Sequence, residues 1–234
     1  MDERDEARPA ERVEAETVFV FGRGVRLRRV FGEFFVEAQL PEDGWTRELR
    51  EELARLRAAG ELLARAPHTW IHHAARDLFA YARDVVELLA TAYDWPDPAP
   101  AVRASWARVE ATTSDSGWKA GRPVTRRVSA ATCALYLQVD EPDPDDPTPG
   151  GVVYRDRARA QEYLLRPRVG LLTAWPAHVE RRALPSVGPA ARARERVVLG
   201  GDLDFAPAAR RAEETSDLAD RAGLGPSLLR GERS

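Results

Sequence analysis

The chain has 234 residues, enough for one domain with a substantial core, and its 44% hydrophobic and 31% charged residues are typical of a globular protein. A net charge of −3 provides no overall positive field for binding nucleic acid. The single cysteine, Cys133, excludes an internal disulfide framework and a thiolate-rich metal site. Because Cys133 lies in an apolar run, we expect a buried thiol.

The N-terminal segment, residues 1–16, is charged and lacks the apolar stretch of a signal peptide. We therefore predict a disordered tail there. No apolar run approaches the roughly 20 residues of a membrane span, so we expect a cytoplasmic protein without a membrane partner. Arginine replaces lysine almost everywhere and alanine is abundant, a bias that resembles proteins of high-GC actinobacteria.

The first half of the chain changes from strand to helix periodicity. Residues 17–40 alternate apolar and charged side chains between glycines, which predicts two or three strands with tight turns. A first helix is predicted at about 43–65, where leucines including Leu49 and Leu53 recur at helical spacing. A second is predicted at about 69–93, ending before a proline-rich segment. We expect both helices to pack outside a sheet.

The second half is rich in short strands separated by glycine turns. The predicted strands are 106–112, 126–130, 132–139, 151–156, 162–166, 170–176 and 194–205. Seven strands at this spacing indicate a β-sandwich or barrel, hence an α+β, mostly β fold. We predict a single domain over 17–207, and a C-terminal tail or peripheral helix over 208–234.

Several motifs follow one another in a familiar order. Tyr136-Leu137 ends a strand, an acidic loop runs over 140–149, Gly150-Gly151 follows, and Pro167 to Gly170 precede an apolar strand. With Arg196 further on, residues from about 105 to 205 resemble the 2-oxoglutarate/Fe(II)-dependent oxygenases, especially the prolyl-hydroxylase-like branch. The resemblance implies a double-stranded β-helix (a jelly roll, cupin-like) with N-terminal strands and two or more helices packed outside it.

The metal-ligand positions depart from that family, whose iron is held by two histidines and one carboxylate. The resemblance puts Thr113 and Asp115 at the His-x-Asp motif, or Arg126 at its histidine, and Arg181 at the second histidine. Arginine there would repel a dication, so we expect no metal. If one binds, the ligands left are Asp115 and His178.

Anion binding is the function that the retained residues favour. The resemblance matches Arg196 to the arginine that pairs with the distal carboxylate of 2-oxoglutarate, and a guanidinium suits a carboxylate. A substrate- or anion-binding pocket would take the side chains Arg196, Arg181, Arg126, Thr113, Tyr136 and Trp118. The alternative is arginines scattered over the surface and aromatic side chains that only pack the core.

Proton transfer is assigned to His178 and Asp115, because histidine is readily tuned to exchange protons near neutral pH. His68, His72 and His73 more simply belong to a solvated helix face. The sequence therefore favours a repurposed enzyme, metal-independent or non-oxidative and without cofactor, acting on a small anionic or peptidic metabolite in bacterial specialised metabolism. One alternative is a true Fe(II)/2-oxoglutarate hydroxylase with unusual ligands; another is a non-catalytic binding or scaffold protein.

Overall fold

The computed structural model describes residues 10–21, 24–40, 44–59, 73–95, 101–111, 115–119, 129–139, 150–156, 158–185 and 195–205. The predicted C-terminal tail lies outside the described residues, as do Thr113 and Arg126. Within this part of the chain, no helix is both long and apolar enough to cross a membrane.

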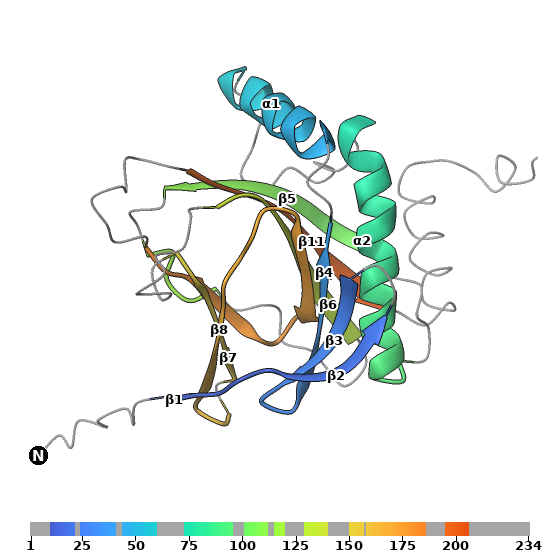
Figure 1. Ribbon diagram of the computed structural model, residues 1–234, viewed down its shortest axis with the longest axis vertical. Coiled ribbons are helices and arrows are strands. Elements are labelled where there is room, and N and C mark those ends of the chain that lie inside the picture. Colours follow the sequence, from blue (N-terminus) through green and yellow to red (C-terminus); the bar gives the residue numbers. More distant parts are fainter. Residues whose placement is uncertain are drawn as a thin grey trace, which may run out of the picture.

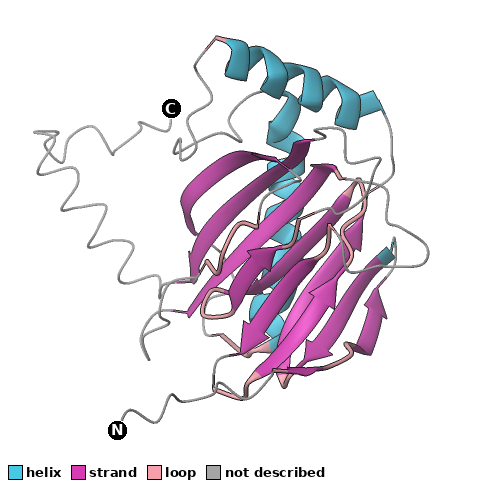
Figure 2. Cartoon of the chain, turned by 90° about the vertical axis from the view of Figure 1, so that its left-hand side faces the viewer, coloured by secondary structure: helices cyan, strands magenta, loops and turns pink. Residues whose placement is uncertain are grey.

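The described residues form two β-sheets and two helices, and the helices follow β4 (Figures 1 and 2). The elements in chain order are β1 (Glu11–Arg12), β2 (Glu16–Phe21), β3 (Val25–Val30), β4 (Glu33–Gln39), α1 (Gly44–Ala58), α2 (His73–Ala92), β5 (Ala101–Ala111), β6 (Ser129–Gln138), β7 (Val152–Asp156), β8 (Gln161–Leu165), β9 (Leu171–Pro176), β10 (Glu180–Ala183) and β11 (Glu195–Phe205).

The larger sheet has the order β2-β3-β4-β9-β6-β11-β5, and the smaller has the order β1-β8-β7-β10. All neighbouring strands are antiparallel except β1 and β8. From β6 onward the chain crosses between the two sheets, with β6, β9 and β11 in the larger and β7, β8 and β10 in the smaller. This arrangement is a jelly roll, as the sequence predicts.

Residues 115–119 extend the smaller sheet beyond β10. Lys119 and Arg181 exchange two backbone hydrogen bonds of 2.8 and 3.0 Å, and the Ser116 amide donates to the Ala183 carbonyl at 3.1 Å. The segment that carries Asp115 therefore lies directly beside the strand that carries Arg181. These are two of the positions where the resemblance expects metal ligands.

Each face of the larger sheet is covered by its own apolar core. On the outer face, α1 and α2 pack through a cluster that includes Leu49, Leu53, Leu89 and Cys133. The predicted positions of Leu49, Leu53 and the buried thiol are thus confirmed. Between the two sheets the core is richer in aromatic side chains, contributed by Phe35, Trp106, Tyr136, Tyr154, Tyr163 and Trp175.

Three sequence predictions were wrong in detail. Glu11–Arg12 belong to the predicted disordered tail, yet they form β1 because their backbone pairs with β8. The predicted strands 126–130 and 132–139 are, in their described part, one strand, β6, since pairing with β11 runs through Ala131. β10, with the sequence Glu-Arg-Arg-Ala, was not predicted because charged side chains occupy both of its faces.

Candidate functional site

Arg181 points into the space between the sheets from the middle of β10. Only 6% of the residue is exposed, and it lies opposite Tyr154 in the β10–β7 register. Its guanidinium carbon is 6.0 Å from the centre of the Tyr136 ring. Tyr136 and Tyr154 are fully buried, and the Tyr154 hydroxyl lies 3.4 Å from the Thr173 hydroxyl. A positive charge therefore lies inside the jelly roll among side chains that bear hydroxyl groups.

The pKa of Tyr154 reflects this interior. Desolvation raises the pKa of its hydroxyl well above the ordinary value, and the Tyr136 hydroxyl adds to the rise, whereas the Arg181 charge opposes it. Tyr154 thus stays a neutral donor near neutral pH. Its hydroxyl is suited to hydrogen bonding and not to ionisation.

Asp115 lies on the outer face of the smaller sheet. The Arg182 Nε donates to both carboxylate oxygens at 2.9 Å, and Arg182 Nη2 also donates to Asp115 Oδ2. The Gly117 amide donates to Oδ1 at 2.8 Å. These bonds, first that of Arg182, hold the pKa of Asp115 below its ordinary value. Within the described chain, the bonds of Asp115 go to these two residues and not to His178.

Trp118 belongs to the same outer face. The Arg155 guanidinium carbon lies 3.9 Å from the Trp118 ring centre, and that of Arg182 lies 5.8 Å away. Arg155 in turn donates from Nε to Glu180 Oε2 at 2.9 Å. Trp118 therefore packs against the guanidinium groups of Arg155 and Arg182 on the outside of the smaller sheet. Arg181 lies on the opposite face of β10.

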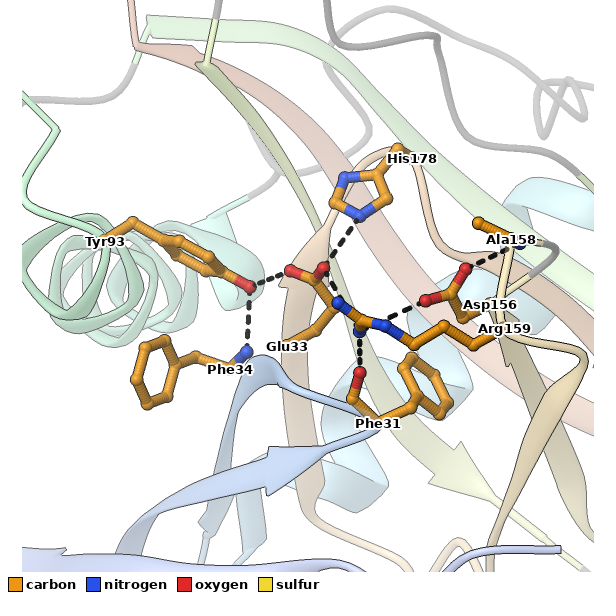
Figure 3. A network of polar contacts seen from close by, with 8 residues as sticks. All are labelled: Phe31, Glu33, Phe34, Tyr93, Asp156, Ala158, Arg159 and His178. Atoms are coloured by element: carbon orange, nitrogen blue, oxygen red, sulfur yellow. Dashed lines mark hydrogen bonds and ion pairs between the residues drawn. The ribbon is translucent and has the colours of Figure 1, made fainter.

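His178 lies in the turn between β9 and β10 and faces Glu33 at the start of β4 (Figure 3). The His178 Nε2 is 3.6 Å from Glu33 Oε1. The Tyr93 hydroxyl, just beyond α2, donates to Glu33 Oε2 at 2.5 Å and accepts a 2.8 Å bond from the Phe34 amide. Elements from both sheets and from the helical layer thus meet at one carboxylate.

Arg159, in the β7–β8 turn, completes this network. Its Nη1 lies 3.9 Å from Glu33 Oε1 and 3.2 Å from Asp156 Oδ2, and it donates to the Phe31 carbonyl. The pKa of Glu33 is lowered, first by His178 and then by Tyr93, although burial opposes the shift. Burial and Glu33 together raise the pKa of Tyr93. No sequence motif pointed to Glu33 or Tyr93, because both are remote in sequence from His178.

Arg196 is buried at the start of β11, with 2% of the residue exposed. Its Nη2 donates to the carbonyls of Gly150 at 2.8 Å and Leu184 at 3.2 Å. Arg196 therefore joins Gly150, which precedes β7, to Leu184, which follows β10. These bonds give Arg196 a structural role, and its place in an anion pocket stays a prediction.

The donor set of the described residues does not fit an Fe(II) site. Arg181 carries a positive charge at one expected ligand position, and the oxygens of Asp115 are bonded to Arg182. Within the described ranges, no three or more His, Cys, Asp or Glu side chains gather closely enough to hold a metal. Fe(II) needs histidine or carboxylate donors that converge on one point.

No protein-family model and no curated protein sequence matches the chain. Among solved structures, a prolyl-4-hydroxylase of Pseudomonas putida matches with a TM-score of 0.54 and 16% identity, over 74% of this chain and 88% of the other. The fold is that of the 2-oxoglutarate/Fe(II)-dependent oxygenases.

Two further solved structures share this fold, and one of them is an epimerase. AviO1 of Streptomyces viridochromogenes Tue57 matches with a TM-score of 0.51 and 14% identity, over 75% of this chain and 91% of the other. The epimerase SnoN, in complex with Fe3+, alpha ketoglutarate and nogalamycin RO, matches with a TM-score of 0.52 and 13% identity, over 75% and 82%. At these identities the likeness concerns the fold, and one fold hosts many reactions.

Proposed function

We propose that this protein is a metal-independent, non-oxidative enzyme that binds a small anionic or peptidic metabolite between its two sheets. The observation that carries the proposal is the buried guanidinium of Arg181 beside Tyr136 and Tyr154. In the proposed enzyme, the positive charge of the Arg181 guanidinium replaces the positive charge that a metal ion supplies in relatives of the same fold.

The physics of burial supports an anionic ligand. A charge in a low-dielectric interior costs free energy, and it attracts an opposite charge more strongly there than in water. Guanidinium matches the geometry of a carboxylate or phosphate. The hydroxyl of Tyr154 is a neutral donor, and with the buried Tyr136 hydroxyl it could complete the ligand's hydrogen bonds.

The proposed chemistry is general acid/base catalysis. A guanidinium held near the reacting group would stabilise negative charge that develops during proton abstraction. His178 is the proposed proton carrier. Asp115 was predicted to share this role, but its bonds to Arg182 support a different one, that of fixing segment 115–119 against β10. Thr113 and Arg126 remain predicted members of the pocket.

The biological setting is proposed from the structural neighbours. AviO1 comes from a Streptomyces, and SnoN is an epimerase from nogalamycin biosynthesis. We therefore propose a cytoplasmic enzyme of bacterial specialised metabolism. SnoN also supports the main alternative, an Fe(II)/2-oxoglutarate enzyme with unusual ligands, in which Arg196 would bind 2-oxoglutarate.

The test is thermal unfolding of the wild type and of Arg181→Met with 2-oxoglutarate, succinate, citrate or phosphate. A ligand at about a hundred times its Kd stabilises by about 2.7 kcal/mol. We expect at least one anion to raise the Tm of the wild type and not that of Arg181→Met. The matched control is Arg168→Gln, which removes an exposed arginine and should keep the effect.

Equal stabilisation of the wild type and Arg181→Met would contradict binding at Arg181. Anaerobic reconstitution with Fe(II) and 2-oxoglutarate, followed by measurement of bound iron, distinguishes the Fe(II)/2-oxoglutarate enzyme from the proposed metal-independent one. Near-stoichiometric iron that is lost in His178→Ala would favour the oxygenase. Absence of both iron binding and anion stabilisation would favour a scaffold protein.

A further inference from the structure

We propose that Glu33 and His178, supported by Tyr93, form a proton-transfer site at the rim of the jelly roll, which takes a hydroxyl or ammonium group of a small metabolite. The inference deepens the proposed function and rests on it, because it identifies Glu33 as the residue that positions the proton carrier His178. It replaces Asp115 in that role.

An exposed imidazole stands in front of a largely buried carboxylate. The His178 side chain is 43% exposed and that of Glu33 is 18% exposed. The Nε2 atom faces Glu33 Oε1 at 3.6 Å, within ion-pair reach but longer than a direct hydrogen bond. The other ring nitrogen, Nδ1, is turned away from the carboxylate (Figure 3). The imidazole therefore has a carboxylate on one side and solvent on the other.

The carboxylate is itself held in place. The Tyr93 hydroxyl donates to Glu33 Oε2 at 2.5 Å, on the oxygen that does not face His178. Tyr93 is fixed by the Phe34 amide at 2.8 Å and by an edge-to-face contact with the Phe34 ring, whose centre is 5.3 Å away. Because Tyr93 donates its only O–H to Glu33, it fixes the orientation of the carboxylate without neutralising it.

The charges around the pair select the kind of group that it can serve. Arg159 contributes one positive charge and contacts two carboxylates, those of Glu33 and Asp156, which contribute two negative charges. With His178 neutral, one negative charge is left in excess. A neutral hydroxyl or a cationic ammonium group is therefore favoured at His178, and an anionic group is disfavoured.

The anionic end of the same metabolite has a separate place. His178 and Arg181 are three residues apart, so their Cα atoms are separated by at most about 11 Å. A small hydroxy or amino acid could present its carboxylate to Arg181 and its proton donor to His178. The proton would pass to the free ring nitrogen of His178 and return to the product, with no net oxidation.

Diethyl pyrocarbonate, which acylates neutral imidazole, tests the pair without knowledge of the substrate. The acylation rate of each histidine is followed by peptide mass spectrometry, at a pH where the rate no longer rises. We expect Glu33→Gln to slow acylation of His178 on the order of threefold, because the carboxylate that faces Nε2 no longer polarises the ring toward the attacking nitrogen. Tyr93→Phe should have a smaller effect.

Glu37→Gln is the matched control, since Glu37 is on the same strand but bonds to Arg28 and Tyr163. Its His178 rate should equal that of the wild type, and His68, His72 and His73 should react alike in all variants. An unchanged rate in Glu33→Gln, or an equal loss in Glu37→Gln, would overturn the proposal.

A second measurement needs no variant. In the wild type, ring 15N shifts of neutral His178 should report a proton on Nε2, the nitrogen that faces the carboxylate. A proton on Nδ1 would overturn the pair. Both measurements are made without added anion, so their outcome is independent of whether Arg181 binds one.

Discussion

Arg181 and Tyr136 lie against each other in the interior of the jelly roll, with the guanidinium carbon 6.0 Å from the ring centre and both side chains buried. The charge comes from β10 and the ring from β6, so the contact spans the two sheets. A cation held in the interior costs desolvation free energy.

Removal of this charge is expected to be tolerated by the fold. Arg181→Met keeps a long, flexible side chain and removes the desolvation cost, so the Tm without ligand should equal or exceed that of the wild type. Thermal denaturation followed by circular dichroism measures it. A loss of more than about 3 kcal/mol would instead mark Arg181 as part of a structural ion network.

The Asp115–Arg182 pair should behave as a coupled unit. Asp115→Asn and Arg182→Gln are each expected to lower the Tm slightly, and the double variant should lose less than the sum. High salt should shrink the coupling, because both side chains are solvent-accessible. Additive losses in a double-mutant cycle would show that the contact contributes nothing.

Glu33 should contribute stability that depends on pH. Its pKa in the folded state is lowered from the ordinary value of 4.5, so its contribution is present above that value and is lost as the pH falls through the folded pKa. The Tm difference between the wild type and Glu33→Gln should therefore be largest near neutral pH and shrink below 4.5. A difference that stays constant over an acid titration would contradict this.

Gly200 should not tolerate a side chain. A Cβ atom there would lie 2.0 Å from Cζ2 of Trp106, whose indole crosses the glycine from β5. Gly200→Ala is expected to cost about 3 kcal/mol by overpacking, measured by urea denaturation. Gly117→Ala is the comparison: its φ is +63° and nothing lies within 4 Å, so only backbone strain of about 1–2 kcal/mol applies. Trp106→Leu should relieve Gly200→Ala but not Gly117→Ala.

Local sequence patterns predicted most of the fold. The apolar runs between glycine turns gave β7, β8 and β9, and leucines at helical spacing gave the buried face of α1. β10 was not predicted from the sequence, because charged residues are expected on only one face of a strand. In β10, Arg181 faces the interior and Arg182 the exterior. A buried charge is an exception that local periodicity cannot register.

The candidate site was predicted less well, because its contacts join distant segments. The contact from Glu33 to Tyr93 spans 60 residues, and that from Asp115 to Arg182 spans 67. Histidine chemistry alone selected His178, but its partner depends on how the β3–β4 turn meets the β9–β10 turn. The order of the motifs selected Arg181 and Arg196. That both side chains are buried could be learned only from the structure.

The two carbonyl bonds of Arg196 hold the residues before β7 and after β10 together, so a diacid bound at Arg196 would act on this junction. A diacid that recruits this guanidinium has to share or displace the bonds to Gly150 and Leu184. Guanidinium has five N–H donors, so sharing is possible only in orientations that keep Nη2 on the carbonyls. A ligand that needs Nη2 would loosen the junction between β7 and β10. One that leaves both carbonyl bonds in place would preserve it.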